Sequence, residues 1–335
     1  MSTTPSASPR APEFHDDNSG VWRRDVLGDS WVARTLHVGC DEEGAVNATL
    51  VRRTAGPRHR RAVLAIHGFV DYFFQEHQAE FFESLGFDFY AIDLRKYGRS
   101  LRPEQTPNYV TELADYRREL EAAQHIIREE EGHDLFVVLG HSTGGLIASL
   151  WANVNDSIDG VILNSPWFDL NKPQIVTWFV DLVMPLVARC HPRRPVGALA
   201  PHYGRALHRD SGGQWDYDLT WKPHDGFPVR AAWLMAIRRG HHAIRRGLHL
   251  PMPVLVLSST RSGSATRFHE ELLTTDSVLR VEHILDGAER LGRDVTVAQV
   301  DEGAHDLSLS QSEKARQAYY DHIAAWLTDR GFLAD

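Results

Sequence analysis

The fold is decided by the stretch Leu135-Phe-Val-Val-Leu-Gly140-His-Ser142-Thr-Gly144-Gly145. A short apolar run leads into a Gly-x-Ser-x-Gly pentad centred on Ser142, and an apolar helical pattern continues to Trp151. A strand, a sharp turn and a helix in this order are typical of a nucleophile elbow, which lifts a serine hydroxyl clear of a sheet. The neighbours must be small because the strand and the helix approach closely. We therefore interpret Ser142 as a candidate nucleophile, and the amide of Thr143 as a candidate oxyanion donor.

A second motif lies upstream, where a pattern typical of a buried strand ends in a His-Gly pair. The run Ala62-Val-Leu-Ala-Ile66 is followed directly by His67-Gly68-Phe69. A tight turn at this point would let the amide of Phe69 supply the second oxyanion donor. His67, Asp71 and His141 are candidate substrate-binding residues near this turn, and a substrate ammonium or hydroxyl would suit Asp71. The alternative for Asp71 is a carboxylate that caps the turn.

A third motif lies late in the chain. The strand-like run Val295-Thr-Val-Ala-Gln-Val300 is followed by Asp301-Glu-Gly303-Ala-His305. A histidine in a short, glycine-containing loop just past a late strand can reach back to a serine as its general base. We therefore predict that His305 is the base for Ser142.

Together these motifs resemble the α/β-hydrolase superfamily, over about Val51 to Leu333. The segment from His67 to Trp151 resembles its branch of monoglyceride lipases, lysophospholipases and serine aminopeptidases. The matching pieces are His67-Gly68, Asp93-Leu-Arg95-Lys-Tyr-Gly98-Arg-Ser100, Gly140-His-Ser142-Thr-Gly144-Gly145 and Gly303-Ala-His305. In the second piece Lys96 stands where the family more often has glycine. The resemblance implies an α/β-hydrolase fold: a mostly parallel central sheet, helices on both faces and an inserted helical cap.

The third member of a catalytic triad is harder to place. In the family an acid follows within a few residues of the strand that corresponds here to Pro253-Val-Leu-Val-Leu257, but in this chain none occurs before Glu270. The family's Asp-x-Val-x-x-Val-Glu segment resumes only at Asp276. We therefore interpret Ser258–Thr275 as an insertion and Asp276 as the acid.

The acid of a triad holds the imidazole in the correct tautomer and stabilises the imidazolium that forms during attack. Asp276 would do this for His305, and Glu270 and Glu271 are the next candidates. Asp276 is also well suited to be the N-cap of a helix predicted over residues 277–291. The two roles are compatible.

The regular alternation of strand and helix patterns stops between residues 167 and 249, and this stretch is the expected cap. Within it the run Gln174–Ala188 predicts a strongly apolar helix. Its apolar side could pack on the core, line an acyl pocket or touch lipid. Trp178 and Phe179 are therefore further candidate substrate-binding residues.

The composition bounds the remaining possibilities. The 335 residues suit one large α/β core, 21–166 with 250–335, carrying a cap, 167–249, behind a disordered tail, 1–20. A net charge of −9 argues against a nucleic-acid partner. Cys40 and Cys190 form no disulfide framework, and no spacing resembles a zinc site, so we expect neither a metal nor a cofactor. No secretory signal and no apolar run of ~20 residues is present, and a cytoplasmic location is the default expectation.

These features favour a serine hydrolase that forms an acyl-enzyme. Serine at the elbow excludes the dehalogenase and epoxide-hydrolase chemistries, which need a carboxylate nucleophile. The expected substrate is an acyl ester, such as a monoacylglycerol or a lysophospholipid. Three alternatives stay open: an aminopeptidase or amidase, an acyltransferase or cyclase that excludes water, and a ligand-binding scaffold.

Overall fold

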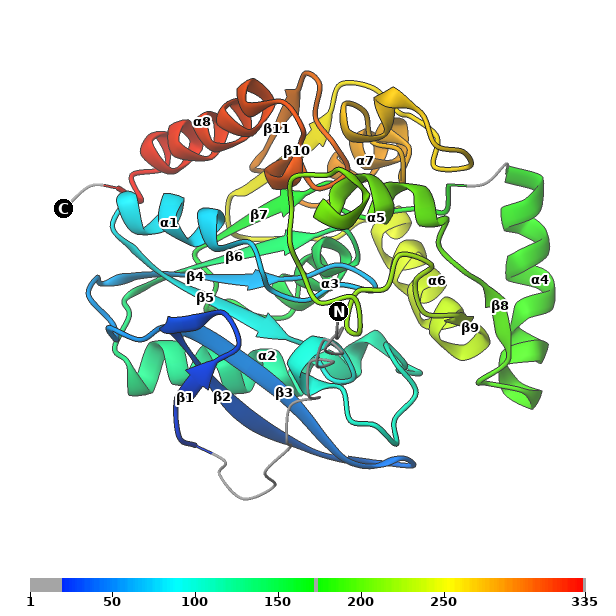
Figure 1. Cartoon of the computed structure of the whole chain (residues 1–335), viewed down its shortest axis with the longest axis horizontal. Coiled ribbons are helices and arrows are strands. Elements are labelled where there is room, and N and C mark those ends of the chain that lie inside the picture. Colours follow the sequence, from blue (N-terminus) through cyan, green and yellow to red (C-terminus); the bar gives the residue numbers. More distant parts are fainter. Residues whose placement is uncertain (1–19, 172–173, 334–335) are drawn as a thin grey trace, which may run out of the picture.

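A computed structural model describes residues 20–171 and 174–333 (Figure 1). The tail predicted for residues 1–20 lies outside the described residues except for Gly20. In the described part the centre is a nine-stranded sheet in the order β1-β2-β3-β5-β4-β6-β7-β10-β11. Its strands are β1 (Arg23–Asp25), β2 (Gly28–Asp41), β3 (Gly44–Arg53), β4 (Arg61–Ile66), β5 (Phe87–Asp93), β6 (Leu135–His141), β7 (Gly160–Asn164), β10 (Val254–Ser259) and β11 (Val295–Val300).

The six strands from β5 to β11 in the sheet order are parallel, whereas β1, β2 and β3 pair antiparallel. Helices cover both faces, which confirms the predicted α/β-hydrolase fold (Figure 1). They are α1 (Glu76–Ser84), α2 (Arg117–His125), α3 (Thr143–Ala152), α4 (Gln174–Cys190), α5 (Pro201–Leu207), α6 (Ala231–Arg246), α7 (Val281–Ala288) and α8 (Glu313–Asp329).

The core has two layers, one on each side of the sheet. Side chains alternate along a strand, so Val63 of β4 packs with α1 and α8, whereas its neighbour Leu64 packs on the side of α2, α3, α6 and α7. Both faces of the central strands are therefore buried. This explains why these strands read as continuous apolar runs rather than as alternating patterns.

The register of the parallel strands brings the three sequence motifs to one edge. Ile66 at the end of β4 lies opposite Gly140 of β6, and His141 lies opposite Asn164 at the end of β7. On the far side of β7, the ends of β10 and β11 are aligned as well. The loops that carry the predicted site residues therefore leave the sheet side by side.

The segment between β7 and β10 adds α4, β8 (Pro195–Gly197), α5, β9 (Val229–Arg230) and α6. In Figure 1 these elements lie toward the right, the end to which the arrows of β4 and β6 point. No helix in the described ranges is long and apolar enough to cross a membrane.

Two predicted helix starts are wrong by a few residues. The spacing Ser310-x-x-Glu313 is that of a capping box and predicts that the last helix begins at Ser310, but the N-cap is Ser312, whose Oγ accepts from the amide of Ala315. Ser310 turns inward instead, and its Oγ accepts from the amide of Ala304 at 2.9 Å. Similarly, α7 begins at Val281, because Asp276 first caps a separate turn.

Candidate active site

Ser142 occupies a strained position between β6 and α3. Its φ of 53° and ψ of −116° are rare for a residue with a side chain. The crossing of strand and helix around it is very tight: a Cβ on Gly144 would lie 2.3 Å from the carbonyl oxygen of Ile66, and a Cβ on Gly140 would lie 2.6 Å from that of Gly144. The two flanking glycines of the pentad are thus required by the geometry.

Hydrogen bonds join the three predicted triad residues into one chain. Ser142 Oγ lies 3.0 Å from His305 Nε2, and His305 Nδ1 lies 3.0 Å and 3.1 Å from the two carboxylate oxygens of Asp276. All three side chains are buried. A proton on Nδ1, donated to the carboxylate, leaves Nε2 free to accept from the serine hydroxyl. The arrangement is suited to general-base activation of Ser142.

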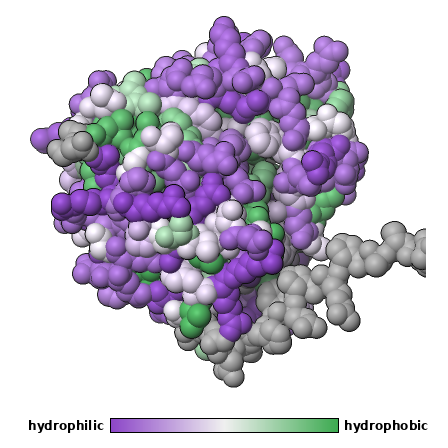
Figure 2. All heavy atoms as spheres, turned by 60° about the vertical axis from the view of Figure 1, so that its left-hand side comes forward, coloured by the Kyte–Doolittle hydropathy of each residue, from purple (hydrophilic) through white to green (hydrophobic). Residues whose placement is uncertain are grey.

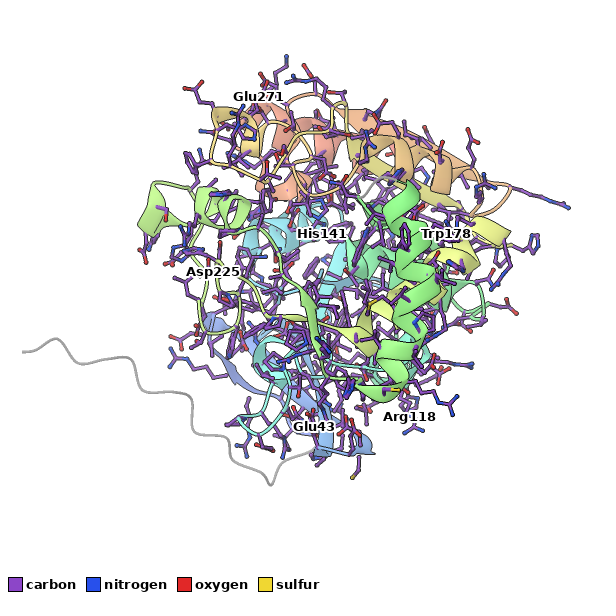
Figure 3. All side chains as sticks on the ribbon, turned by 90° about the vertical axis from the view of Figure 1, so that its right-hand side faces the viewer. Glu43, Arg118, His141, Trp178, Asp225 and Glu271 are labelled. Carbon is purple, nitrogen blue, oxygen red and sulfur yellow. The ribbon has the colours of Figure 1, made fainter. Side chains whose placement is uncertain are left out.

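Asp276 reaches this position because the two ends of the insertion before it are joined to each other. Ser262 and Asp276 form an isolated β-bridge, in which the amide of Asp276 donates to the carbonyl of Arg261 and the amide of Gly263 donates to that of Asp276. The chain returns from the insertion to the end of β10, where the family usually carries its acid. Glu271 is exposed at the outer edge of the molecule (Figure 3), and Glu270 is also exposed.

Asp276 caps a turn and is not the N-cap of α7, which is Arg280. Its Oδ1 accepts from the amides of Val278 and Leu279, at 3.0 Å and 2.7 Å, while the carboxylate also faces His305. The turn at Val278 and Leu279 therefore fixes the orientation of the carboxylate, and α7 plays no part in this.

The two predicted oxyanion donors flank Ser142. Thr143 is the first residue of α3, so its amide has no partner one turn earlier in the helix. Phe69 lies on the turn after β4, between Gly68 and Val70, whose φ is 51°. A Cβ on Gly68 would lie 3.2 Å from the Cβ of Ser142, which places this turn directly against the nucleophile.

His67 is held by the backbone on both ring nitrogens. Nδ1 donates to the carbonyl of Gly68 at 2.8 Å, and Nε2 accepts from the amide of Leu94 at 3.0 Å. Burial lowers the pKa of His67, which favours the neutral ring that both bonds require. The geometry therefore gives His67 a structural task and leaves it no free nitrogen for a substrate.

Asp71 and His141 lie deep beside the site. Asp71 is buried, and its Oδ1 accepts from Nζ of Lys222 in the cap at 2.6 Å. The ring of His141 lies 4.9 Å from that of His305, and its Nδ1 lies 3.2 Å from the carbonyl oxygen of Asn164. Burial lowers the pKa of His141. Figure 3 places His141 near the centre of the view, beside α4.

Sequence reasoning missed a third buried carboxylate at the site, that of Asp306. It accepts from Nδ2 of Asn164 at 2.9 Å and from the hydroxyl and amide of Ser308. Burial alone would raise the pKa of Asp306, but His141 and these hydrogen bonds outweigh it and hold the pKa below its usual value. The amide of Asp306 donates to the hydroxyl of Tyr203, a cap residue whose ring lies 6.0 Å from that of His305. Asp306 thus fixes the backbone next to the candidate base.

A small cavity lined by both polar and apolar side chains lies behind these residues. It offers about 30 Å³ of space, enough for one or two water molecules. Its polar lining comes from Asp71, Gln75, His141, Asn164 and Asp306, among others. Within the described ranges, no group of three or more His, Cys, Asp or Glu side chains could hold a metal ion.

The cap helix α4 is oriented with its apolar side outward. Its exposed apolar side chains are Val176, Trp178, Phe179, Leu182, Val183 and Leu186, between 40% and 67% exposed. Figure 3 shows α4 at the front of the molecule with Trp178 on it. Trp178 and Phe179 therefore lie on an open surface and do not line an enclosed pocket.

Polar groups on the inner side of α4 bind this helix to α6. The guanidinium of Arg238, fully buried, donates twice to Asp181 of α4 at 2.8 Å and once to Asp169 at 2.6 Å. His242 lies 3.1 Å from the same Asp181. We call Arg238, Asp169, Asp181 and His242 the α4–α6 polar cluster. The cluster holds the Asp181 side of α4 against α6, and the six exposed apolar side chains lie on the other side.

The fold and the elbow define an α/β-hydrolase. More particularly, residues 57–271 match the model of the serine aminopeptidase S33 family, Hydrolase_4, and the chain belongs to this family of hydrolases. No curated protein matches the chain.

Solved structures share the fold at low sequence identity. A monoacylglycerol lipase of Paleococcus ferrophilus is similar with a TM-score of 0.60 and 20% identity, over 82% of this chain and 96% of that one. A soluble variant of monoglyceride lipase from Saccharomyces cerevisiae reaches 0.63 at 15% identity, over 96% and 99%. A thermostable carboxyl esterase from Bacillus coagulans reaches 0.62 at 14%, over 90% and 99%.

Proposed function

We propose that this hydrolase cleaves carboxylic esters through an acyl-enzyme formed on Ser142. The observation that carries the proposal is the buried, hydrogen-bonded chain from Ser142 through His305 to Asp276. It stands at the edge of the sheet where the family's nucleophile elbow belongs. A strained serine with a base within 3.0 Å has the geometry that nucleophilic catalysis requires.

The proposed reaction has two similar halves. Ser142 Oγ attacks the ester carbonyl carbon while His305 Nε2 takes the hydroxyl proton, and the resulting imidazolium is stabilised by Asp276. The C–O bond to the alcohol then breaks as His305 returns that proton to the leaving oxygen. Water, deprotonated by His305, attacks the acyl-enzyme in the same manner, which releases the carboxylic acid and restores Ser142.

The amides of Phe69 and Thr143 are the proposed oxyanion donors. Both come from backbone positions fixed by tight turns, so little reorganisation is needed as negative charge develops on the carbonyl oxygen. In comparable sites one such donor is worth roughly 3 kcal/mol of transition-state stabilisation.

The proposed substrate class is an acyl ester of glycerol or a lysophospholipid. The support comes from α4, whose exposed aromatic and aliphatic side chains suit a lipid surface. Exposed Arg189 and Arg194 follow the apolar side near the C-terminal end of α4 and add an attraction for anionic lipid. The fold neighbours that are named monoacylglycerol and monoglyceride lipases are compatible with this class.

Cleavage of aminoacyl amides is the second candidate, favoured by the description of the family as serine aminopeptidases. Such a substrate carries an ammonium group, for which Asp71 was the expected partner. That carboxylate is already paired with Lys222 at 2.6 Å. Ester cleavage is therefore the better supported proposal.

The test uses the purified full chain. We expect hydrolysis of p-nitrophenyl esters across several chain lengths, little action on aminoacyl anilides, and a single site of labelling by a fluorophosphonate. Ser142→Ala should abolish labelling and lower kcat by about 10⁴-fold or more. EDTA should leave the rates unchanged. Labelling that persists in S142A, or anilide cleavage faster than ester cleavage, would contradict the proposal.

A further inference from the structure

Lys222 is a cap lysine that reaches into the core. Its Nζ lies 2.6 Å from Oδ1 of Asp71, and the side chain is only 15% exposed. The ammonium also lies 5.6 Å from the ring centre of Phe74 and 5.5 Å from that of Tyr217. This lysine is therefore held in one place by a buried carboxylate and two aromatic faces.

The partner carboxylate belongs to the turn that carries the proposed oxyanion donor. Asp71 is 3% exposed, and its second oxygen, Oδ2, accepts from the amide of Gly68 at 3.4 Å. That contact closes the turn over Phe69 and Val70. The peptide group that presents the Phe69 amide to Ser142 therefore lies inside a small ring whose closing group is the Asp71 side chain.

The cap segment that carries Lys222 docks on the same part of the core. The amide of Asp218 donates to the hydroxyl of Tyr72 at 2.7 Å, and the ring of Trp221 meets that of Tyr72 edge-on at 5.1 Å. Lys222 thus reaches Asp71 from a segment that is already fixed to the neighbouring residue of the turn.

We propose that Lys222 is a positioning residue, which sets the geometry of the oxyanion site through Asp71. The inference rests on the proposed ester hydrolysis. Lys222 holds the Asp71 carboxylate inward, Asp71 keeps the Gly68 amide in place, and the Phe69 amide keeps its direction toward the carbonyl oxygen. Cap placement and oxyanion binding are therefore coupled through one ion pair.

The expected effect follows from the cost of an unpaired buried charge. Without Lys222, the buried Asp71 carboxylate has lost its charged partner, which is strongly unfavourable, so the side chain should turn toward water. That movement releases the Gly68 amide. A shift of about 1 Å in a group that meets the transition state can cost on the order of 100-fold in rate.

The experiment compares four variants of the full chain with the wild type on one soluble p-nitrophenyl ester. Lys222→Met removes the charge and keeps the length of the side chain. Lys222→Arg keeps the charge. Asp71→Asn combined with Lys222→Met leaves no net charge in the pair, and its amide oxygen can still accept from Gly68. Lys314→Met, at an exposed position of α8, is the matched control.

We expect K222M to lower kcat by between 10- and 100-fold with less than a threefold change in KM. The Ki of an alkyl trifluoromethyl ketone, whose hemiketal oxygen occupies the oxyanion site, should rise by the same factor as kcat falls. K222R and the double variant should recover most of the loss, and K314M should match the wild type. Each Tm is measured alongside, so that any unfolded fraction is accounted for.

Three results would overturn the inference. One is a K222M chain with wild-type kcat. Another is a K222M chain with a lower Tm whose folded fraction has the wild-type kcat, which would mean that the ion pair only stabilises the fold. The third is a Ki for the ketone that does not change with kcat. A wild-type chain that hydrolyses no ester would overturn the proposed function together with this inference, so the two failures are distinguishable.

Discussion

Helices α3 and α4 are both strongly apolar in sequence, yet α3 is buried and α4 is largely exposed. Every residue of α3 except Leu150 is buried, while α4 turns six large apolar side chains outward. The difference comes from polar partners: α3 has the sheet on one side and α6 nearby, whereas α4 is bound to α6 through Asp181. An apolar run thus predicts that a helix forms, but its paired charge, Asp181 in α4, shows which side of the helix faces the protein.

The same contrast separates the sheet edge from the outer side of the cap. At the sheet edge, Asp71, Asp276 and Asp306 are buried, and each has a hydrogen-bonding partner. On α4 six large apolar side chains face outward, and Asp181 faces α6. The side of the molecule brought forward in Figure 2, which turns α4 away from the viewer, is mostly hydrophilic with smaller apolar areas. The buried carboxylates at the sheet edge hold neighbouring groups in place for chemistry, whereas the exposed apolar area of α4 suits contact with another surface.

The largest effect is expected at the sheet edge. Asp276→Asn keeps the shape of the side chain, and its carbonyl oxygen can still accept from the amides of the turn. It removes the charge that stabilises the imidazolium and allows the wrong tautomer of His305, so kcat should fall by about 10⁴-fold. The measurement is kcat on a soluble ester, with circular dichroism to show that the fold is intact.

The matched controls for this variant are Glu270→Gln and Glu271→Gln. Both glutamates are exposed and lie on the insertion rather than at the imidazole. Each control should stay within about twofold of the wild type, as surface changes usually do. An active D276N chain beside an inactive E270Q or E271Q chain would show that the insertion has been misinterpreted.

A smaller effect is expected at the inner side of the cap, where His241 is fully buried beside Arg238. Burial, together with the charge of Arg238, lowers the pKa of His241 to about 3. Above pH ~6.5 the ring is neutral in both the folded and the unfolded chain, so this histidine adds no pH dependence to the free energy of unfolding. Below that pH only the unfolded chain takes up the proton, and stability falls progressively until the pH reaches the folded pKa.

At pH 5 this single group should account for a loss of about 2 kcal/mol relative to pH 7.5. Denaturant unfolding at the two pH values gives the loss in the free energy of unfolding between pH 7.5 and pH 5. In His241→Asn this loss should be smaller than in the wild type by about that amount. His249→Asn is the control, because that side chain is exposed. An equal loss in wild type and H241N would mean that the ring is protonated inside the folded protein.

The smallest effect is expected on the outer side of α4. Replacing Trp178 and Phe179 with serine removes two large side chains that are already exposed, so the fold should be unaffected. If they meet lipid, KM for long-chain esters presented as micelles should rise about 10-fold, equivalent to about 1.4 kcal/mol, while acetyl esters stay unchanged. Phe268→Ser, an equally exposed aromatic on the insertion, is the control. Equal changes in KM for long-chain and acetyl esters would contradict contact of the outer side of α4 with lipid.

The sheet edge could be predicted largely from the sequence, because its signals are local. A pentad between a strand and a helix identifies Ser142, and a histidine just past the last strand identifies His305. Both follow from the chain order, and the parallel sheet brings their loops together. Asp276 could be predicted only with the family pattern. Arg261, Ser262 and Gly263, which bond to Asp276 near the end of β10, show no recognisable motif in the sequence.

The contributions of the cap could not be predicted in this way. Lys222, Tyr203 and Arg238 reach their partners across long stretches of sequence, and no local pattern records which carboxylate or which histidine they will meet. The same limit applies to helix starts. Ser310 and Ser312 are equally good caps in the sequence, and only the contact of Ser310 with the amide of Ala304 decides between them.

The bridge between Ser262 and Asp276 has a consequence for how this chain could be altered. Because the two ends of the insertion are joined at its base, the segment between them can change in length while the carboxylate keeps its place. The entropic cost of a longer loop rises only slowly with the number of residues added. The exposed tip near Phe268 is therefore a natural point at which to graft a tag, a linker or a second protein onto the enzyme.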